Sequence, residues 1–139
     1  MTMRTLGQKR AEYALKVVLN TKETLSESGR KEFKSFSAGS PTMILQNGFG
    51  QALAFWLSKA TDKDLKIKPN DKHFLLFKMV MDWLQYEKGD VKNRFIKKTG
   101  SPTEFLEEIS KMGQGDYLAA QKEALALLEW VKRFANADL

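Results

Sequence analysis

Apolar residues recur at helical spacing along most of the chain. Between Thr5 and Glu23, apolar side chains return every three or four residues, while lysine and glutamate fall on the opposite side. The same periodicity predicts helices over residues 71–87, 102–112 and 116–135. No segment alternates β-branched and polar residues as a half-buried strand does. The pattern therefore favours an all-α fold.

The segment "GSPTMILQNGFGQALAFWLSKA", residues 39–60, fits two different structures. Its Asn47-Gly48 pair, with apolar residues on both sides, is typical of a tight β-hairpin turn. However, its large apolar residues step by three or four positions, and Ser40 and Pro41 suit the N-cap and the first position of a helix. We therefore predict a helix that starts at Pro41 and continues to Ala60, with a break or kink at Asn47-Gly48 as the alternative.

Two glycines inside this predicted helix need an explanation. Each costs roughly 1 kcal/mol relative to alanine in a helix interior. Gly50, Ala54 and Leu57 form one narrow strip of the helix, with Gly48 beside it. We expect another helix backbone to pack closely against this strip, and the approach of a ligand to the glycines is the alternative.

Polar stretches divide the rest of the chain. They predict breaks at residues 26–29 and 38–40, with a short helix over residues 30–36 between them. The predicted helix over residues 71–87 is apolar on much of its circumference. We expect such a helix at the centre of a bundle, or exposing one face to a partner chain.

The tetrapeptide Gly-Ser-Pro-Thr occurs twice, at residues 39–42 and 100–103, and both copies predict a capped helix start. Between the later helices, residues 89–100 fit a short helix or a loop. The sum is a single-domain bundle of five to six helices over residues 1–139.

Composition narrows the function classes. Twenty-three Lys and Arg against 17 Asp and Glu give a net charge of +6, which favours polyanionic partners. A positive surface without any partner is the alternative. The absence of cysteine suits a reducing cytoplasm. No secretory segment is visible, and no segment approaches the ~18 continuous apolar residues of a membrane span.

Few residues support catalysis or metal binding. His73 is the only histidine, so a His/Cys metal site has too few ligands. Glu107 and Glu108 are adjacent and point about 100° apart on a helix, so they do not form an acid–base pair. The sequence has no P-loop, dinucleotide fingerprint or nucleophile elbow. We therefore expect a protein that is not an enzyme and has no cofactor or metal.

Positive side chains on adjacent turns hold phosphates without reading a base sequence. The segment "GDVKNRFIKKTG", residues 89–100, carries four cations against one acid, Asp90. Two further cations near the end of the last helix extend this charge. The predicted phosphate contacts are Arg10, Lys59, Lys92, Arg94, Lys97, Lys98, Lys132 and Arg133.

Three segments carry a resemblance to a known family: "QKRAEYAL" near the start, "SPTMILQNGFGQALAFWLSK" in the middle and "QKEALALLEWVKRFANADL" at the end. Together they resemble the small helical subunit of the type III-B CRISPR effector, the Cmr complex, and the middle block is the most specific. The resemblance implies a non-catalytic, all-helical, cytoplasmic protein of antiviral defence. It also implies several copies stacked along the backbone subunits, helping to form the groove for guide RNA and target RNA. Target cleavage in that family is attributed to the backbone subunit.

The middle block supplies the motif residues that this resemblance carries over, and the family assigns none of them a catalytic task. We expect them to pack helices or to form a subunit interface. They are Gln46, Asn47, Gly48, Gly50 and Gln51.

Two other function classes stay open: a stand-alone helical DNA-binding regulator, and a structural adaptor without nucleic-acid contact. The sequence lacks a clear helix-turn-helix pair with a polar recognition face. Measuring whether RNA binding needs the backbone subunit, and how it falls with salt, separates these classes.

Overall fold

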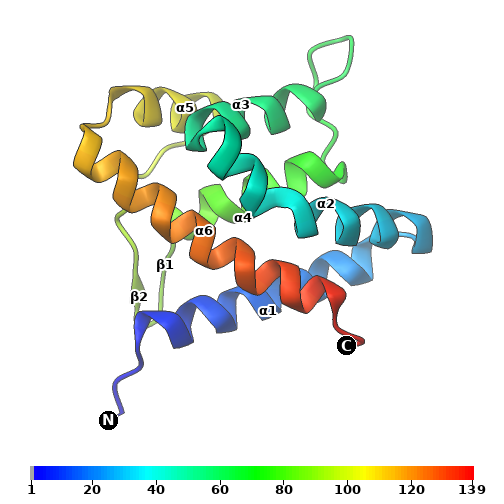
Figure 1. The fold of residues 1–139 in the computed structure, drawn as a ribbon, viewed down its shortest axis with the longest axis horizontal. Helices are drawn as coiled ribbons and strands as arrows, with labels where there is room; N and C mark the ends of the chain where they lie inside the picture. Colours follow the sequence, from blue (N-terminus) through cyan, green and yellow to red (C-terminus); the bar gives the residue numbers. More distant parts are fainter. Residues whose placement is uncertain (1) are drawn as a thin grey trace.

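Six helices and one short hairpin make up residues 2–139, which are the residues that the computed structural model describes (Figure 1). This confirms the all-α fold and the expected number of helices. In chain order the elements are α1 (Leu6–Thr24), α2 (Glu27–Asn47), α3 (Phe49–Lys59), α4 (Lys72–Leu84), β1 (Glu87–Lys88), β2 (Val91–Lys92), α5 (Pro102–Lys111) and α6 (Gln114–Asn136). None of the helices in this described range is long and apolar enough to cross a bilayer.

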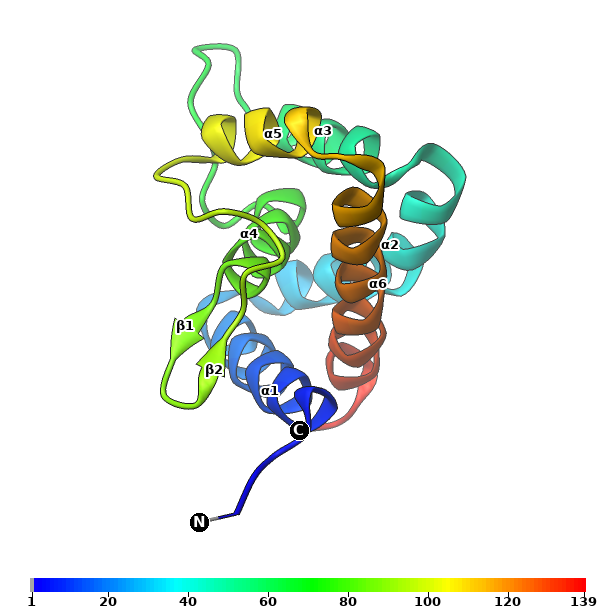
Figure 2. The same cartoon turned by 90° about the vertical axis from the view of Figure 1, so that its left-hand side faces the viewer.

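Helix α4 lies at the centre of the bundle, as its apolar circumference predicted. It packs against α1, α2, α3 and α6, and Figure 2 shows it with α3 and α5 above it and α1 below. Phe77, Val80 and Trp83 are fully buried. Because the helix has neighbours on several sides, apolar residues around most of its circumference find a place in the core.

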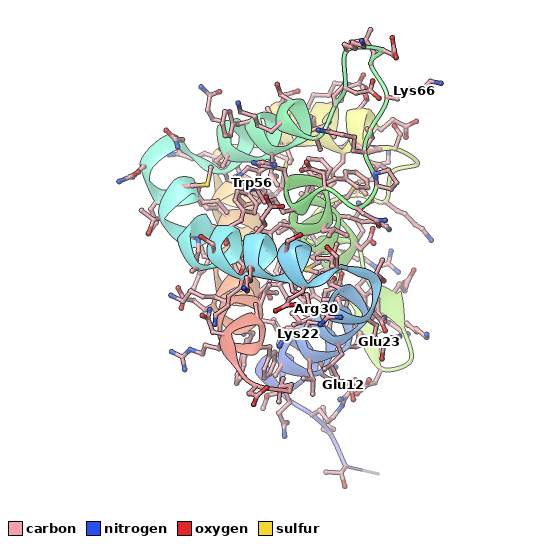
Figure 3. The ribbon with its side chains drawn as sticks, turned by 90° about the vertical axis from the view of Figure 1, so that its right-hand side faces the viewer. Glu12, Lys22, Glu23, Arg30, Trp56 and Lys66 are labelled. Carbon is pink, nitrogen blue, oxygen red and sulfur yellow. The ribbon has the colours of Figure 1, made fainter. Side chains whose placement is uncertain are left out.

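Helix α2 runs without a break from Glu27 to Asn47, so the predicted break at residues 38–40 and the predicted helix start at Pro41 are wrong. Proline has no N–H to donate to the carbonyl of Ser37 four residues earlier. The Ser40 hydroxyl donates to that carbonyl instead, at 2.8 Å. Ser40 therefore replaces a lost backbone bond inside the helix rather than capping a new one, and α2 bends in its second half (Figure 3).

Gly48 ends α2 and precedes α3, so the alternative of a break at Asn47-Gly48 is the correct one. Its backbone has φ of +90°, a region that side-chain-bearing residues rarely adopt. The Gly48 N–H still donates to the Ile44 carbonyl, and the Gly48 carbonyl accepts from the Ala52 N–H. The chain thus changes direction at one residue and resumes as a helix, which excludes the hairpin at this position.

Gly50 lies against a side chain, so the expected close approach of another backbone is wrong. The Tyr117 hydroxyl of α6 accepts a hydrogen bond from the Gly50 N–H at 2.9 Å. A methyl group added at Gly50 meets this hydroxyl at 3.6 Å and Ile109 at 3.5 Å, which are ordinary contact distances. Tyr117 therefore satisfies one of the free backbone donors in the first turn of α3, because the N-cap residue, Gly48, has no side chain that could do so.

The connection between α4 and α5 contains a hairpin that the sequence did not predict. Glu87 pairs with Lys92 and Lys88 with Val91, around a turn in which Gly89 has φ of +62°. Each strand is two residues long, which is too short to show an alternating pattern. The sequence predicted a short helix or a loop over residues 89–100. The residues that complete the hairpin are neither, so the prediction is wrong for them, and it is correct for the loop that follows the hairpin.

The two Gly-Ser-Pro-Thr copies adopt different structures. The second copy starts α5 as predicted, because the Ser101 hydroxyl accepts from the Glu104 N–H at 3.2 Å and Pro102 is the first helical residue. The first copy lies inside α2. The predicted repetition of the capping motif is therefore correct at one site only.

Candidate nucleic-acid interface

The second strand of the hairpin, β2, and the loop that follows it alternate buried anchors with exposed cations. Val91, Asn93 and Ile96 are buried. Between and after them, four cationic residues reach solvent; they are Lys92, Arg94, Lys97 and Lys98. We call residues 91–99 the cationic connection. Its sequence places charge on the surface because every second or third residue is held in the core.

Hydrogen bonds to the end of α4 hold the cationic connection in place. The Asn93 N–H donates to the Tyr86 carbonyl, and the Asn93 side-chain amide donates to the Trp83 carbonyl, both at 2.8 Å. Farther along, the Thr99 hydroxyl donates to the Gln85 side-chain oxygen at 3.1 Å. The lysines therefore project from a backbone that is fixed at both ends of the segment, which lowers the entropic cost of binding an extended polyanion.

Two acidic side chains near the cationic connection are already paired, one with Arg94 of the connection itself and one with Arg4. Arg94 pairs with Glu87 at 2.6 Å, and Asp90 accepts from Arg4 at 2.7 Å. The hydrogen bonds from Arg4 hold the pKa of Asp90 below its usual value. Within residues 2–139, no carboxylate lies within 4.0 Å of the ammonium groups of Lys92, Lys97 or Lys98. No ion pair within these residues therefore competes with an external anion for the three lysines.

Lys132 and Arg133 belong to a different part of the surface, so the structure does not place them as an extension of the cationic connection. The hairpin is tied to the start of α1, where the Lys9 ammonium donates to the Asp90 carbonyl. The end of α6 is tied to the end of α1, where the Lys22 ammonium donates to the Phe134 carbonyl. Lys22 follows Lys9 by thirteen residue steps of α1, which corresponds to roughly 20 Å. Lys132 also pairs with Glu129 at 3.3 Å.

Lys59 forms a third, separate position at the end of α3. Its ammonium lies 5.5 Å from the centre of the exposed Phe55 ring, which is a cation–π distance. The cationic connection, the pair Lys132 and Arg133, and Lys59 therefore lie on three separate surfaces rather than on one. That these residues contact phosphates stays a prediction.

Arg10 does not suit a phosphate contact. Its guanidinium donates two hydrogen bonds to Glu123, at 2.6 and 2.7 Å, and only 17% of its side chain is exposed. Glu123 is 6% exposed and also accepts from the Trp83 indole N–H at 2.8 Å. Arg10 therefore links α1 to α4 and α6 inside the bundle. Sequence reasoning missed this pair, although Glu123 lies on the apolar face of its helix next to Ala120 and Ala124, which was the available signal.

The motif residues gather at the junction of α2 and α3. Gln46, Asn47 and Gln51 are exposed, whereas Gly48 and Gly50 face Tyr117. A surface hollow between the two helices is lined by Met43, Asn47, Gln51, Ala52, Ala54, Phe55 and Ser58. The junction therefore presents amides beside apolar side chains.

His73, the only histidine, has a structural position. Its ring Nδ1 lies 2.8 Å from Asp71 Oδ1, and Asp71 also accepts from the His73 backbone N–H at 2.8 Å. Burial raises the pKa of Asp71, but the hydrogen bonds from His73 outweigh this effect and the pKa lies below its ordinary value. Asp71 is thus the N-cap of α4. Among residues 2–139, no three His, Cys, Asp or Glu side chains are grouped to hold a metal ion.

Comparison with known families identifies the family of this chain. Residues 6–138 match the family described as CRISPR-associated protein (Cas_Cmr5), which is almost the whole chain. The chain belongs to this family, and it is therefore a subunit of a Cmr complex in CRISPR defence.

Proposed function

We propose that this Cmr subunit is non-catalytic and helps to hold guide RNA and target RNA, in copies stacked along the backbone subunits of the complex. The observation that carries the proposal is the cationic connection, where Lys92, Lys97 and Lys98 are exposed and have no carboxylate partner among residues 2–139. Each such lysine neutralises a phosphate without reading a base. Backbone subunits, further copies of this chain and the two RNAs are accordingly the proposed partners.

The structure supports a holding role through the shape of the segment. The three lysines project from a backbone anchored to α4. The segment that carries them, β2 and the loop after it, runs along one side of the molecule (Figure 2). An extended RNA strand meets such a surface without any need for an enclosed pocket. A holding surface of this kind does not discriminate between target sequences.

A salt titration tests this proposal. Changing Lys92, Lys97 and Lys98 together to Ala in the assembled complex removes three phosphate contacts. We expect weaker RNA binding for all target sequences, and a slope of log K against log salt that is shallower by roughly two units. The affinity is measured at several salt concentrations after assembly has been confirmed.

A matched control keeps the same change in net charge. Lys16, Lys34 and Lys63 are exposed on three other parts of the surface, and their replacement by Ala is expected to leave the slope nearly unchanged. Equal effects of the two triple variants indicate a general charge effect, and no effect of either favours a structural adaptor without RNA contact.

A further inference from the structure

Another hollow lies where helices α2, α3 and α4 pack against one another. It is open to solvent and has a volume of about 640 Å³, within the range of roughly 300–1,000 Å³ for small-molecule sites. None of its lining residues belongs to the cationic connection. We call it the three-helix hollow, and its charged and aromatic lining residues are Lys31, Glu32, Phe36, Lys59, Lys72 and His73.

Cations from all three helices border the three-helix hollow. Lys31 belongs to α2, Lys59 to α3 and Lys72 to α4, so the fold gathers this charge from distant parts of the sequence. Among the lining residues that the structure describes, Glu32 is the only acid. Lys31 lies 4.0 Å from the exposed Glu27, and within residues 2–139 no carboxylate lies within that distance of the other two ammonium groups. The lining is therefore positive and attracts anionic groups such as phosphate.

Two aromatic side chains complete the lining. Phe36 packs edge-on against Trp56, a fully buried residue of α3 (Figure 3), with ring centroids 5.6 Å apart. The centroids of the Phe36 and His73 rings are 4.6 Å apart. These contacts hold the Phe36 ring in place while part of it stays accessible from the hollow. Aromatic side chains on such a surface provide a platform for an unpaired base.

His73 adds a hydrogen-bonding group to the hollow. The pKa of Asp71 lies below its ordinary value, so at neutral pH its carboxylate accepts hydrogen bonds and donates none. His73 Nδ1, which lies 2.8 Å from Asp71 Oδ1, is therefore the donor of this contact. In the neutral ring Nε2 is then an acceptor, and it has no hydrogen-bond partner among residues 2–139. It is available to a ligand that carries a hydroxyl group.

We propose that the three-helix hollow binds a nucleotide with an unpaired base, either free or as part of a single strand. The lysines hold the phosphate, Phe36 contacts the base, and His73 Nε2 accepts from a ribose hydroxyl. Inorganic phosphate uses only the first of these contacts, and an uncharged aromatic ligand lacks it. The combination of cations, an aromatic platform and an acceptor thus matches the three parts of a nucleotide. This site is separate from the cationic connection and does not depend on the RNA-holding role.

The single histidine provides a direct readout of binding. Selective ¹³C labelling of histidine gives ring signals from His73 alone. In a nuclear magnetic resonance titration of the full-length protein with AMP, we expect these signals to shift until the site is saturated. Ribose 5-phosphate lacks the base and inorganic phosphate also lacks the sugar, so each is expected to bind roughly ten-fold more weakly than AMP.

A short single-stranded RNA distinguishes the two sources of the nucleotide. An RNA that binds roughly ten-fold more tightly than AMP assigns the site to a nucleotide within a strand. An RNA that shifts the His73 signals no more readily than AMP assigns it to a free nucleotide. The proposal is overturned if neither ligand shifts the signals, or if inorganic phosphate binds as tightly as AMP.

Charge-removing variants locate the site. Lys59→Ala/Lys72→Ala takes two cations from the hollow and keeps the histidine probe, and we expect it to weaken AMP binding roughly ten-fold or more. Lys16→Ala/Lys122→Ala is the matched control, because both lysines are exposed on α1 and α6 and the change in net charge is the same. It is expected to alter the affinity by less than about two-fold, since distant exposed charges are screened. Equal losses in the two variants overturn the proposal.

The two proposed sites are tested separately. The triple lysine variant of the cationic connection changes no residue of the three-helix hollow, so its affinity for AMP is expected to equal that of wild type. Loss of AMP binding in this variant overturns the assignment to the three-helix hollow. Normal AMP binding together with an unchanged salt slope in the same variant contradicts only the RNA-holding role.

Discussion

Glu123 is a buried carboxylate whose partners come from two other helices. It accepts two hydrogen bonds from Arg10 of α1 and one from the Trp83 indole of α4. Removing one member of a buried ion pair leaves the other charged and unpaired, which is far more costly than the pair is stabilising. This residue therefore controls how α1, α4 and α6 stay together.

We predict that Glu123→Ala lowers the free energy of unfolding by about 3–5 kcal/mol. Urea denaturation of Arg10→Met, of Glu123→Met and of the Arg10→Met/Glu123→Met double variant measures the coupling. The double variant is expected to lose less free energy of unfolding than the sum of the two single losses. Glu87→Ala, which breaks the exposed pair with Arg94, is the control and costs less than about 1 kcal/mol. Additive losses at Arg10 and Glu123 contradict the interpretation of a buried pair.

At the scale of elements, the start of α4 depends on pH through its capping residue. The pKa of Asp71 is lower in the folded protein than in the unfolded chain. The ionised cap therefore stabilises the fold above the unfolded value of roughly 3.9, and this stabilisation is lost as the pH falls through the lower, folded value. Asp71→Asn retains a capping side chain but does not ionise.

We predict that wild type is more stable than Asp71→Asn at pH 6, and that the difference shrinks below about pH 4 as Asp71 gains a proton. Thermal unfolding of both proteins between pH 3 and pH 6 measures it. A difference that stays constant over this range shows that the charge of Asp71 does not stabilise the helix start.

Periodicity predicted α1, α4, α5 and α6 because each has one apolar side that the fold buries. It failed at Pro41, where the same Ser-Pro letters describe a helix start or a helix interior. A Ser40 hydroxyl that donates to the Ser37 carbonyl decides between them, and only three-dimensional structure shows it. The partner of Gly50 was equally hidden, because Tyr117 is far away in the sequence.

The candidate site was predictable in part. A local cluster of four cations is visible in the letters of residues 91–98, and the structure shows all four exposed. Burial of Arg10 was not predictable from its neighbours, since its partner Glu123 is 113 residues away. Nor does the sequence show that the end of α6 and the cationic connection lie at opposite ends of α1.

At the scale of the whole molecule, this separation shapes how RNA binding responds to substitution. The cationic connection and the pair Lys132 and Arg133 are roughly 20 Å apart along α1. Groups this far apart that share no partner residue within the protein act independently. If both groups contact one RNA, their effects on the free energy of binding add.

We predict that Lys132→Ala/Arg133→Ala weakens RNA binding less than the triple lysine variant does, because Lys132 is already paired with Glu129 at 3.3 Å. Combining all five substitutions is expected to weaken binding by the sum of the two separate free-energy changes, within about 0.5 kcal/mol. Titrations of the four assembled complexes at one fixed salt concentration measure this sum. If the five-fold variant binds no more weakly than the triple variant, the end of α6 does not contact the RNA.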